Sequence, residues 1–171
     1  MTARSVPGSS PDTVPVPDPA SDIAPPAVPD AVPIGYELPP LAVPVTRTLI
    51  VAGALASRDY QDVHHDAEAA REKGSPDIFM NILTTGGLVG RYVTDWAGPG
   101  AELRKLAIRL GAPNHPGDTM TLTGRVTALA DDRTAEIAVR GTNRLGDHVT
   151  GTITVRLPPP QPPASGAGVP S

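Results

Sequence analysis

The chain has 171 residues, a formal net charge of −4 at pH 7 and no cysteine, which predicts about one domain without disulfides or thiolate metal ligands. Only 3% of the residues are aromatic; neither this share nor the acidic balance suits a nucleic-acid binder, which needs a basic face and stacking rings. No apolar run is long enough for a transmembrane helix or a secretory signal, so we expect a cytoplasmic protein.

Prolines divide the chain into three parts. Of the 22 prolines, eleven lie in residues 1–40 and six in residues 158–171. Proline lacks a backbone donor and fixes φ, so such segments favour extended, solvated chain over a packed core. We therefore predict a disordered extension at 1–37, one folded domain at 38–157 and a disordered tail at 158–171.

The first half of the folded part predicts one strand and two helices. Residues 45–57 (VTRTLIVAGALAS) are rich in β-branched and small apolar residues and favour a strand. A short helix follows, with Asp66 as N-cap and Gly74 as its end. Apolar residues at helical spacing then predict a long helix from about Asp77 to Trp96.

The second half switches to a period of two, which predicts four half-buried antiparallel strands. Their alternating apolar residues begin at Leu106, Met120, Ile137 and Val149. The sheet must cover a long, mostly apolar helix among strands, because packing along one stripe would leave many of the helix's apolar side chains exposed to water. The expected fold class is α+β: a single hot-dog domain, in which an antiparallel sheet wraps around a long central helix.

Half of the four histidines lie together in Ser57-Arg-Asp-Tyr-Gln-Asp-Val-His-His-Asp66. Asp59 and His64 could hold one water molecule between them, the carboxylate accepting its proton and the imidazole orienting it or protonating the product. Backbone N–H groups near Asn81, in the long helix, could stabilise an oxyanion. The same residues could also serve only as caps and turn formers. Adjacent histidines without thiolates make a poor closed zinc site, so we expect no metal.

The remaining candidate residues have less specific patterns. Gly86 begins a glycine-rich stretch without the lysine of a phosphate loop, which favours close helix-to-sheet approach or room for an acyl group. Asp62 and His65 are assigned to the loop surface. His115 lies in a turn and His148 alternates outward on a strand, so both are interpreted as structural or exposed.

These residues resemble the MaoC-like, or (R)-specific, enoyl-CoA hydratase family. That family's motif is Asp-x-Asn-Pro-x-His, and here it is Asp59-Tyr-Gln-Asp-Val-His64, with the Asn-Pro replaced. The sequence is most similar to the small subunits of actinobacterial steroid side-chain hydratases, over about residues 38–155. The matching blocks are ALASRDYQDVHHD, GSPDIFMNILTTGGLVGRYVTDWAGP and NRLGDHVT.

The resemblance implies a function and a partner. It implies hydration of a bulky, steroid side-chain enoyl-CoA without a cofactor beyond the CoA of the substrate, with Asp59 as base and His64 as proton donor. Asn81 and Gly86 are the implied oxyanion or substrate-binding positions, although the wider family has glycine at 81. It also implies an α2β2 assembly with a second MaoC-like subunit, which can carry a fused zinc-ribbon/OB module. A hot-dog thioesterase and a non-catalytic scaffolding subunit stay open as alternatives.

Overall fold

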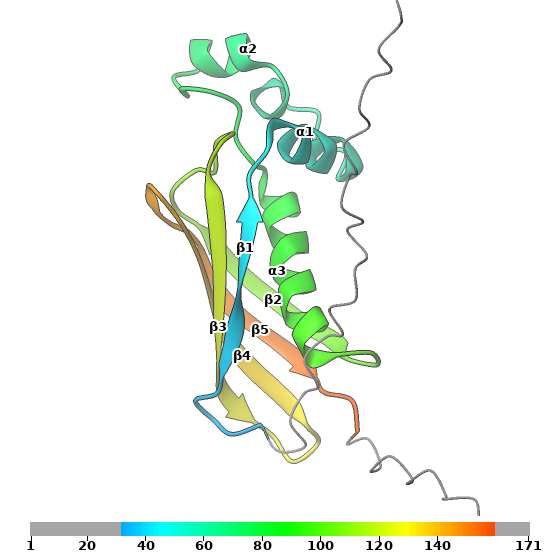
Figure 1. Cartoon of the computed structure of the whole chain (residues 1–171). Coiled ribbons are helices and arrows are strands. Elements are labelled where there is room, and N and C mark those ends of the chain that lie inside the picture. The colour runs from blue at the N-terminus through cyan, green and yellow to red at the C-terminus, as the bar shows by residue number, and fades with distance from the viewer. Residues whose placement is uncertain (1–31, 160–171) are drawn as a thin grey trace, which may run out of the picture.

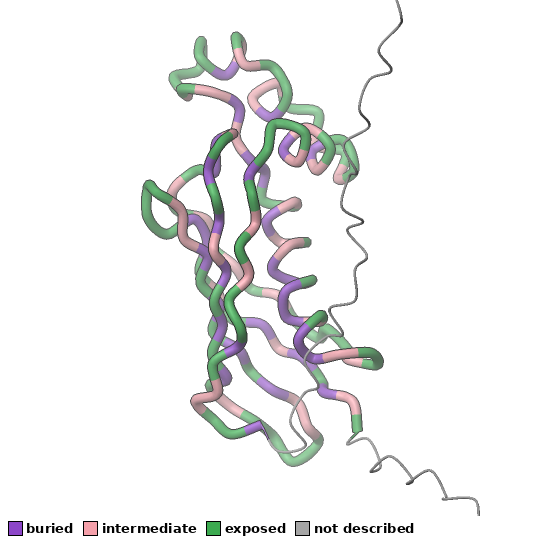
Figure 2. The backbone as a smooth tube through the Cα atoms, in the orientation of Figure 1, coloured by how far each residue is buried: buried purple, intermediate pink, exposed green. Residues whose placement is uncertain are grey.

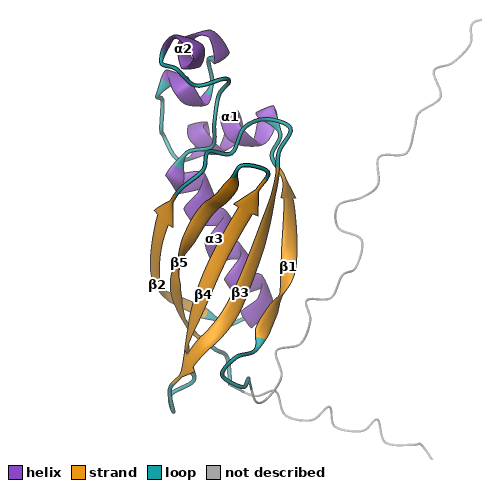
Figure 3. Cartoon of the chain, turned by 90° about the vertical axis from the view of Figure 1, so that its left-hand side faces the viewer, coloured by secondary structure: helices purple, strands orange, loops and turns teal. Residues whose placement is uncertain are grey.

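The computed structural model describes residues 32–159. Five strands form one antiparallel sheet in the order β1-β3-β4-β5-β2, and the long helix α3 lies across one face of it (Figures 1 and 3). The strands are β1 (Glu37–Pro44), β2 (Glu102–Leu110), β3 (Thr119–Leu129), β4 (Thr134–Asn143) and β5 (Gly146–Arg156). The helices are α1 (Arg47–Ala56), the short 3-10 helix η1 (Asp62–His64), α2 (Ala67–Glu72) and α3 (Ile82–Ala97). The α+β hot-dog prediction is confirmed.

The core lies between α3 and the inner face of the sheet (Figure 2). The helix contributes fully buried Val89 and Val93 to it, and the strands contribute alternate residues such as Leu122, Ile137 and Ile153. This alternation confirms the four predicted strands of the second half, because a period of two places every other side chain on one face.

The predicted strand at 45–57 is wrong, because this segment forms α1. Thr46 caps the helix by accepting a hydrogen bond from the backbone N–H of Leu49 at 3.0 Å. Ile50 and Ala54 are the buried residues of α1, and their i,i+4 spacing is that of a helix stripe. Three alanines and two leucines in the helix offset the strand preference of its β-branched residues.

The first strand, β1, lies earlier in the chain and contains Pro39 and Pro40. Prolines are tolerated there because β1 is an edge strand, paired only with β3. The β1–β3 register shifts between Leu38 and Leu41, at the two prolines. The predicted disordered ends comprise residues 1–37 and 158–171, of which 1–31 and 160–171 lie outside the described residues, and the three-part division stays a prediction.

The long helix begins at Ile82, five residues later than predicted. Asp77 does not start a helix: its carboxylate accepts from the backbone N–H of Ile78 at 2.8 Å and pairs with Arg47 at 2.7 Å. The chain then runs without helical structure to Asn81, which is the N-cap of α3. This correction places Asn81 at the helix terminus and not inside the helix.

Candidate active site

A tight turn after α1 positions Asp59. Ser57 is the C-cap of α1, and Arg58 follows in the left-handed region with φ 56°, an uncommon conformation for a residue with a side chain. The backbone N–H of Asp59 then donates to the carbonyl of Ala54 at 2.9 Å. The turn folds the chain back over the helix end, so the Asp59 carboxylate points toward the start of α3.

His64 ends η1 and is fixed by the extended segment before α3. Its Nδ1 lies 2.7 Å from the carbonyl oxygen of Phe79, and the Phe79 ring meets the imidazole edge-on with centroids 5.1 Å apart. A carbonyl can only accept, so Nδ1 carries a hydrogen, and Nε2 is the atom left to exchange a proton. His64 is buried, with 6% of its surface exposed.

The structure brings the two predicted catalytic side chains together. Asp59 Oδ2 lies 3.3 Å from His64 Nε2, and the Asp59 side chain is 18% exposed. A carboxylate and an imidazole nitrogen at this separation can share a proton or hold the same water molecule. The loop therefore brings an ionisable pair together and is not only a set of caps, although Asp66 does cap α2 as predicted.

Asn81 links this pair to the N-terminus of α3. Its side-chain amide donates to Asp59 Oδ2 at 3.0 Å and to Ser57 Oγ at 2.9 Å, while its carbonyl oxygen accepts from the backbone N–H of Thr84 at 2.9 Å. The hydrogen bond from Asn81 lowers the pKa of Asp59 below its ordinary value, despite the opposing effect of burial. The carboxylate is thus ionised at neutral pH and can accept a proton.

A cavity of about 260 Å³ opens beside the pair. Its lining includes Asp59, His64, Asn81 and the first residue of α3, Ile82, with the segment after β2 on the other side. The first N–H groups of a helix have no partner inside the helix and carry partial positive charge. The cavity therefore brings together a carboxylate, an imidazole and the N–H groups of a helix N-terminus.

His148 also lines this cavity, and its predicted outward orientation is wrong. The β4–β5 register shifts between Gly141 and Thr142, so both His148 and Val149 are buried and the alternation breaks. His148 Nδ1 lies 2.7 Å from the carbonyl of Ala112 and Nε2 lies 2.8 Å from Thr85 Oγ1. Burial lowers the pKa of His148, which favours the neutral ring that accepts from Thr85.

The sequence pattern could not identify His148 as a site residue, because the alternating residues of β5 do not indicate where the register of the strand shifts. The one available signal was its position in the block NRLGDHVT, which carries the family resemblance. Thr85 likewise lies in a matching block, GSPDIFMNILTTGGLVGRYVTDWAGP, but its place among apolar helix residues did not single it out.

The other predicted residues lie away from the cavity. Gly86 lies in α3 and faces β2, where an added Cβ would meet Ile108 at 3.7 Å, an ordinary van der Waals contact, so the helix-to-sheet distance does not require glycine here. Asp62 pairs with Lys73 at the surface, and His65 is exposed, as predicted. His115 is buried and structural, with Nδ1 3.0 Å from the carbonyl of Ile78.

Two negative findings hold for residues 32–159. No group of three or more His, Asp or Glu side chains there is arranged to hold a metal ion. In the same part of the chain, no helix has the length and apolarity needed to cross a membrane.

The family called MaoC like domain matches residues 33–148, which include the whole site. The chain belongs to this family. The 3-oxo-4,17-pregnadiene-20-carboxyl-CoA hydratase beta subunit of Mycobacterium tuberculosis is 51% identical over 124 residues, covering 72% of this chain and 95% of the relative. The resemblance seen in the sequence is therefore confirmed.

Solved structures of MaoC-like proteins have the same fold. A chain of the ChsH1-ChsH2 complex from Mycobacterium tuberculosis superposes with a TM-score of 0.73 at 49% identity, covering 75% of this chain and 100% of that one. The (R)-hydratase PhaJ1 from Pseudomonas aeruginosa superposes with a TM-score of 0.71 at 21% identity, covering 84% of this chain and 94% of that one. At that identity the second likeness supports the MaoC-like fold alone.

Proposed function

We propose that the chain is the catalytic subunit of an enoyl-CoA hydratase, which adds water across an α,β double bond. The observation that carries this proposal is the 3.3 Å separation of Asp59 Oδ2 and His64 Nε2 beside a cavity at the N-terminus of α3. The relative named as a steroid CoA-thioester hydratase subunit supports the same reaction class.

In the proposed reaction, the water oxygen attacks Cβ while Asp59 accepts one of its protons. The imidazolium of His64 donates a proton to Cα, and the negative charge that develops on the thioester oxygen is met by N–H groups at the start of α3. The proton on Asp59 then passes to His64 across the 3.3 Å separation, which restores both groups. This sequence balances in atoms and charge, so it requires no cofactor.

We propose further that the substrate is a bulky, steroid side-chain enoyl-CoA and that a second MaoC-like subunit completes the site, in an α2β2 assembly. A cavity of about 260 Å³ falls below the usual range of about 300–1,000 Å³ for ligand pockets, so a steroid acyl group needs walls from another subunit. The relative named as a beta subunit and the two-component ChsH1-ChsH2 complex support this. A zinc-ribbon/OB module on the partner and a cytoplasmic location belong to the same proposal.

The test is hydration by the assembled protein, followed as loss of enoyl absorbance with a steroid side-chain enoyl-CoA and with a short-chain one. We expect Asp59→Asn and His64→Ala to lower kcat by ~10²-fold or more while the complex still assembles. Asp62→Asn is the matched control, because Asp62 lies in the same loop but pairs with Lys73 at the surface.

Two results would refute this proposal. Unchanged turnover in both variants would mean that the chain is a scaffold and that its partner holds the active site. Release of CoA from a saturated thioester, without loss of enoyl absorbance from the unsaturated one, would identify a thioesterase.

A further inference from the structure

His148 and Thr85 form a buried hydrogen bond beside the candidate active site that the proposed reaction does not use. His148 is 1% exposed and Thr85 is 0% exposed. Thr85 Oγ1 lies 2.8 Å from His148 Nε2, and His148 is the residue of β5 that lines the cavity of about 260 Å³. Burial of polar groups costs free energy that an apolar pair would not, so this pair indicates a role beyond packing.

A register shift directs His148 to this position. The β4–β5 pairing shifts between Gly141 and Thr142, and the neighbouring side chains of His148 and Val149 are both buried. Such irregular pairing is frequent next to active sites, where it redirects a side chain. It thus places an imidazole at the cavity wall in a strand whose regular alternation would face that residue outward.

The hydrogen bond from His148 to Ala112 fixes the ring. It is not needed to hold the segment after β2, which is already paired with β5 through the backbone. Gly111 N–H donates to the carbonyl of His148 at 2.8 Å, and the next N–H, that of Ala112, donates to Asp147 at 2.7 Å. His148 Nδ1 donates to the carbonyl of Ala112 at 2.7 Å, which leaves Nε2 of the neutral ring as an acceptor. This acceptor is therefore held in place for the Thr85 hydroxyl.

Thr85 connects His148 to the first turn of α3. Its backbone N–H donates to the carbonyl of Asn81 at 3.2 Å, and its hydroxyl oxygen lies 3.2 Å from the same carbonyl oxygen. The side chain of Asn81 in turn donates to Asp59 at 3.0 Å. The turn whose N–H groups meet the oxyanion in the proposed reaction is thus held from two directions along the chain, by β5 through Thr85 and by the residues after α1 through Asn81.

We propose that His148 and Thr85 are positioning residues, which orient the first turn of α3 relative to Asp59 and His64; this inference rests on the proposed hydration. Neither side chain exchanges a proton with the substrate, because both nitrogens of His148 and the Thr85 hydroxyl are engaged within the protein. They fix the direction of the helix N–H groups toward the thioester oxygen, whose negative charge develops in the transition state. Loss of the link should therefore lower kcat and leave KM nearly unchanged.

The test is hydration by the full-length chain assembled with its partner. Thr85→Val keeps the shape of the side chain and removes the hydroxyl, so we expect kcat to fall ~10-fold or more, as it does when reacting groups are misplaced, with little change in KM. Thr85→Ser keeps the hydroxyl and should retain most of the activity. His148→Gln should retain more activity than His148→Asn, because only glutamine is long enough to offer Thr85 an acceptor near the position of Nε2.

A double variant tests whether the two residues act through one hydrogen bond. Thr85→Val combined with His148→Asn should be no slower than the slower of the two single variants, because each of them has already broken the link. Losses that multiply would show independent effects and would overturn the proposal.

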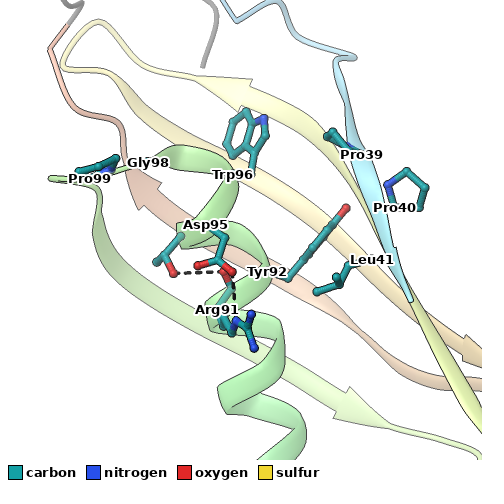
Figure 4. A pocket seen from close by; sticks show the side chains of 10 residues that line it. Pro39, Pro40, Leu41, Arg91, Tyr92, Asp95, Trp96, Gly98 and Pro99 are labelled. Carbon is teal, nitrogen blue, oxygen red and sulfur yellow. Dashed lines mark hydrogen bonds and ion pairs between the residues drawn. The ribbon is translucent and has the colours of Figure 1, made fainter. Parts of the chain in front are cut away.

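Thr94→Val is the matched control and should leave kcat unchanged. Thr94 lies in the same helix, and its hydroxyl donates to the carbonyl of Gly90 at 3.1 Å, four residues earlier. It lines a separate cavity between β1 and the C-terminal half of α3 (Figure 4), which no step of the proposed reaction uses.

Three results separate this inference from the proposed function. An equal fall of kcat in Thr94→Val and Thr85→Val would overturn the inference alone, because the loss would then be general to the helix. A normal kcat in Thr85→Val, with Asp59→Asn still slow, would also overturn it and leave the proposed function standing. Absence of hydration by the assembled parent protein would refute the proposed function and the inference with it.

Discussion

At the scale of single residues, the amide of Asn81 has two separate tasks. Its carbonyl oxygen caps α3 through Thr84, and its nitrogen donates to Asp59. Only the second contact stabilises the ionised carboxylate, which is the form that accepts a proton from water in the proposed reaction. The two tasks can be separated by substitution, because serine is a good N-cap but is too short to reach Asp59.

We expect Asn81→Ser to raise the pKa of Asp59, because the donor that favours the charged form is lost. A larger share of Asp59 is then protonated at acid pH, so kcat/KM should begin to fall at a higher pH than in the parent protein. The measurement is the pH profile of kcat/KM, whose acid limb reports groups of the free enzyme.

Asn81→Ala is the companion variant for this experiment. It should move the acid limb in the same direction and also lower the free energy of unfolding by about 1 kcal/mol, because the cap is lost as well. An acid limb that stays in place in both variants would show that Asp59 is not the titrating base.

At the scale of elements, the contact between α1 and α3 places the active site. Asp59 follows directly from the C-terminus of α1, and Asn81 begins α3, so the distance between these side chains depends on how closely the helices pack. Gly53 of α1 lies against Thr84 of α3, and a Cβ at position 53 would overlap the threonine side chain. Glycine at 53 therefore permits the close approach that lets Asn81 reach Asp59.

We expect Gly53→Ala to separate the two helices, because the α3 backbone near Thr84 cannot yield without disturbing its cap. The free energy of unfolding should fall by about 1–3 kcal/mol, as for other overpacked sites, and kcat should fall with it. Urea unfolding and the hydration assay measure the two effects.

Gly87→Ala is a suitable control, because Gly87 is also helical but has nothing within 4 Å of an added Cβ. At that position alanine should be neutral or stabilising by about 0.5–1 kcal/mol. Equal loss of stability in the two variants would exclude the helix contact as the cause.

At the scale of the whole molecule, the sheet has two free edges among the described residues, and they differ in character. β1 carries prolines, whereas β2 ends the sheet on the other side. Leu103 of β2 is 43% exposed, and Ile82 and Leu83 at the start of α3 are 49% and 55% exposed. An unprotected edge strand with an exposed leucine, together with exposed apolar residues at the start of α3, is suited to a partner subunit.

We expect Leu103→Glu to weaken assembly with the proposed second MaoC-like subunit while this chain stays folded, because the Leu103 side chain is 43% exposed in the single chain. Size-exclusion chromatography of the co-expressed proteins measures the complex, and circular dichroism measures folding. Leu129→Glu is the control, since Leu129 is 37% exposed at the far end of β3. Loss of the complex in both variants, or in neither, would place the interface elsewhere.

Much of this molecule could be predicted from patterns confined to neighbouring residues. The alternation in β2 to β5, the apolar stripe of α3, and the Asp66 cap all involve residues within a few positions of one another, where side-chain periodicity reports the backbone directly. The Asp59 and His64 motif is also local, and it was identified through the spacing that the family shares.

The errors fall where contacts between distant residues outweigh local preference. The β-branched residues of the α1 segment predict a strand, but the joint burial of Ile50 and Ala54 stabilises a helix there. No strand is predicted at Pro39 and Pro40, yet an edge strand with a register shift accommodates both prolines. The alternation of β5 predicts an outward-facing His148, but the β4–β5 register shift places its side chain at the cavity. Burial, edge position and register are properties of the assembled sheet, so they decide these residues only after the strands have paired.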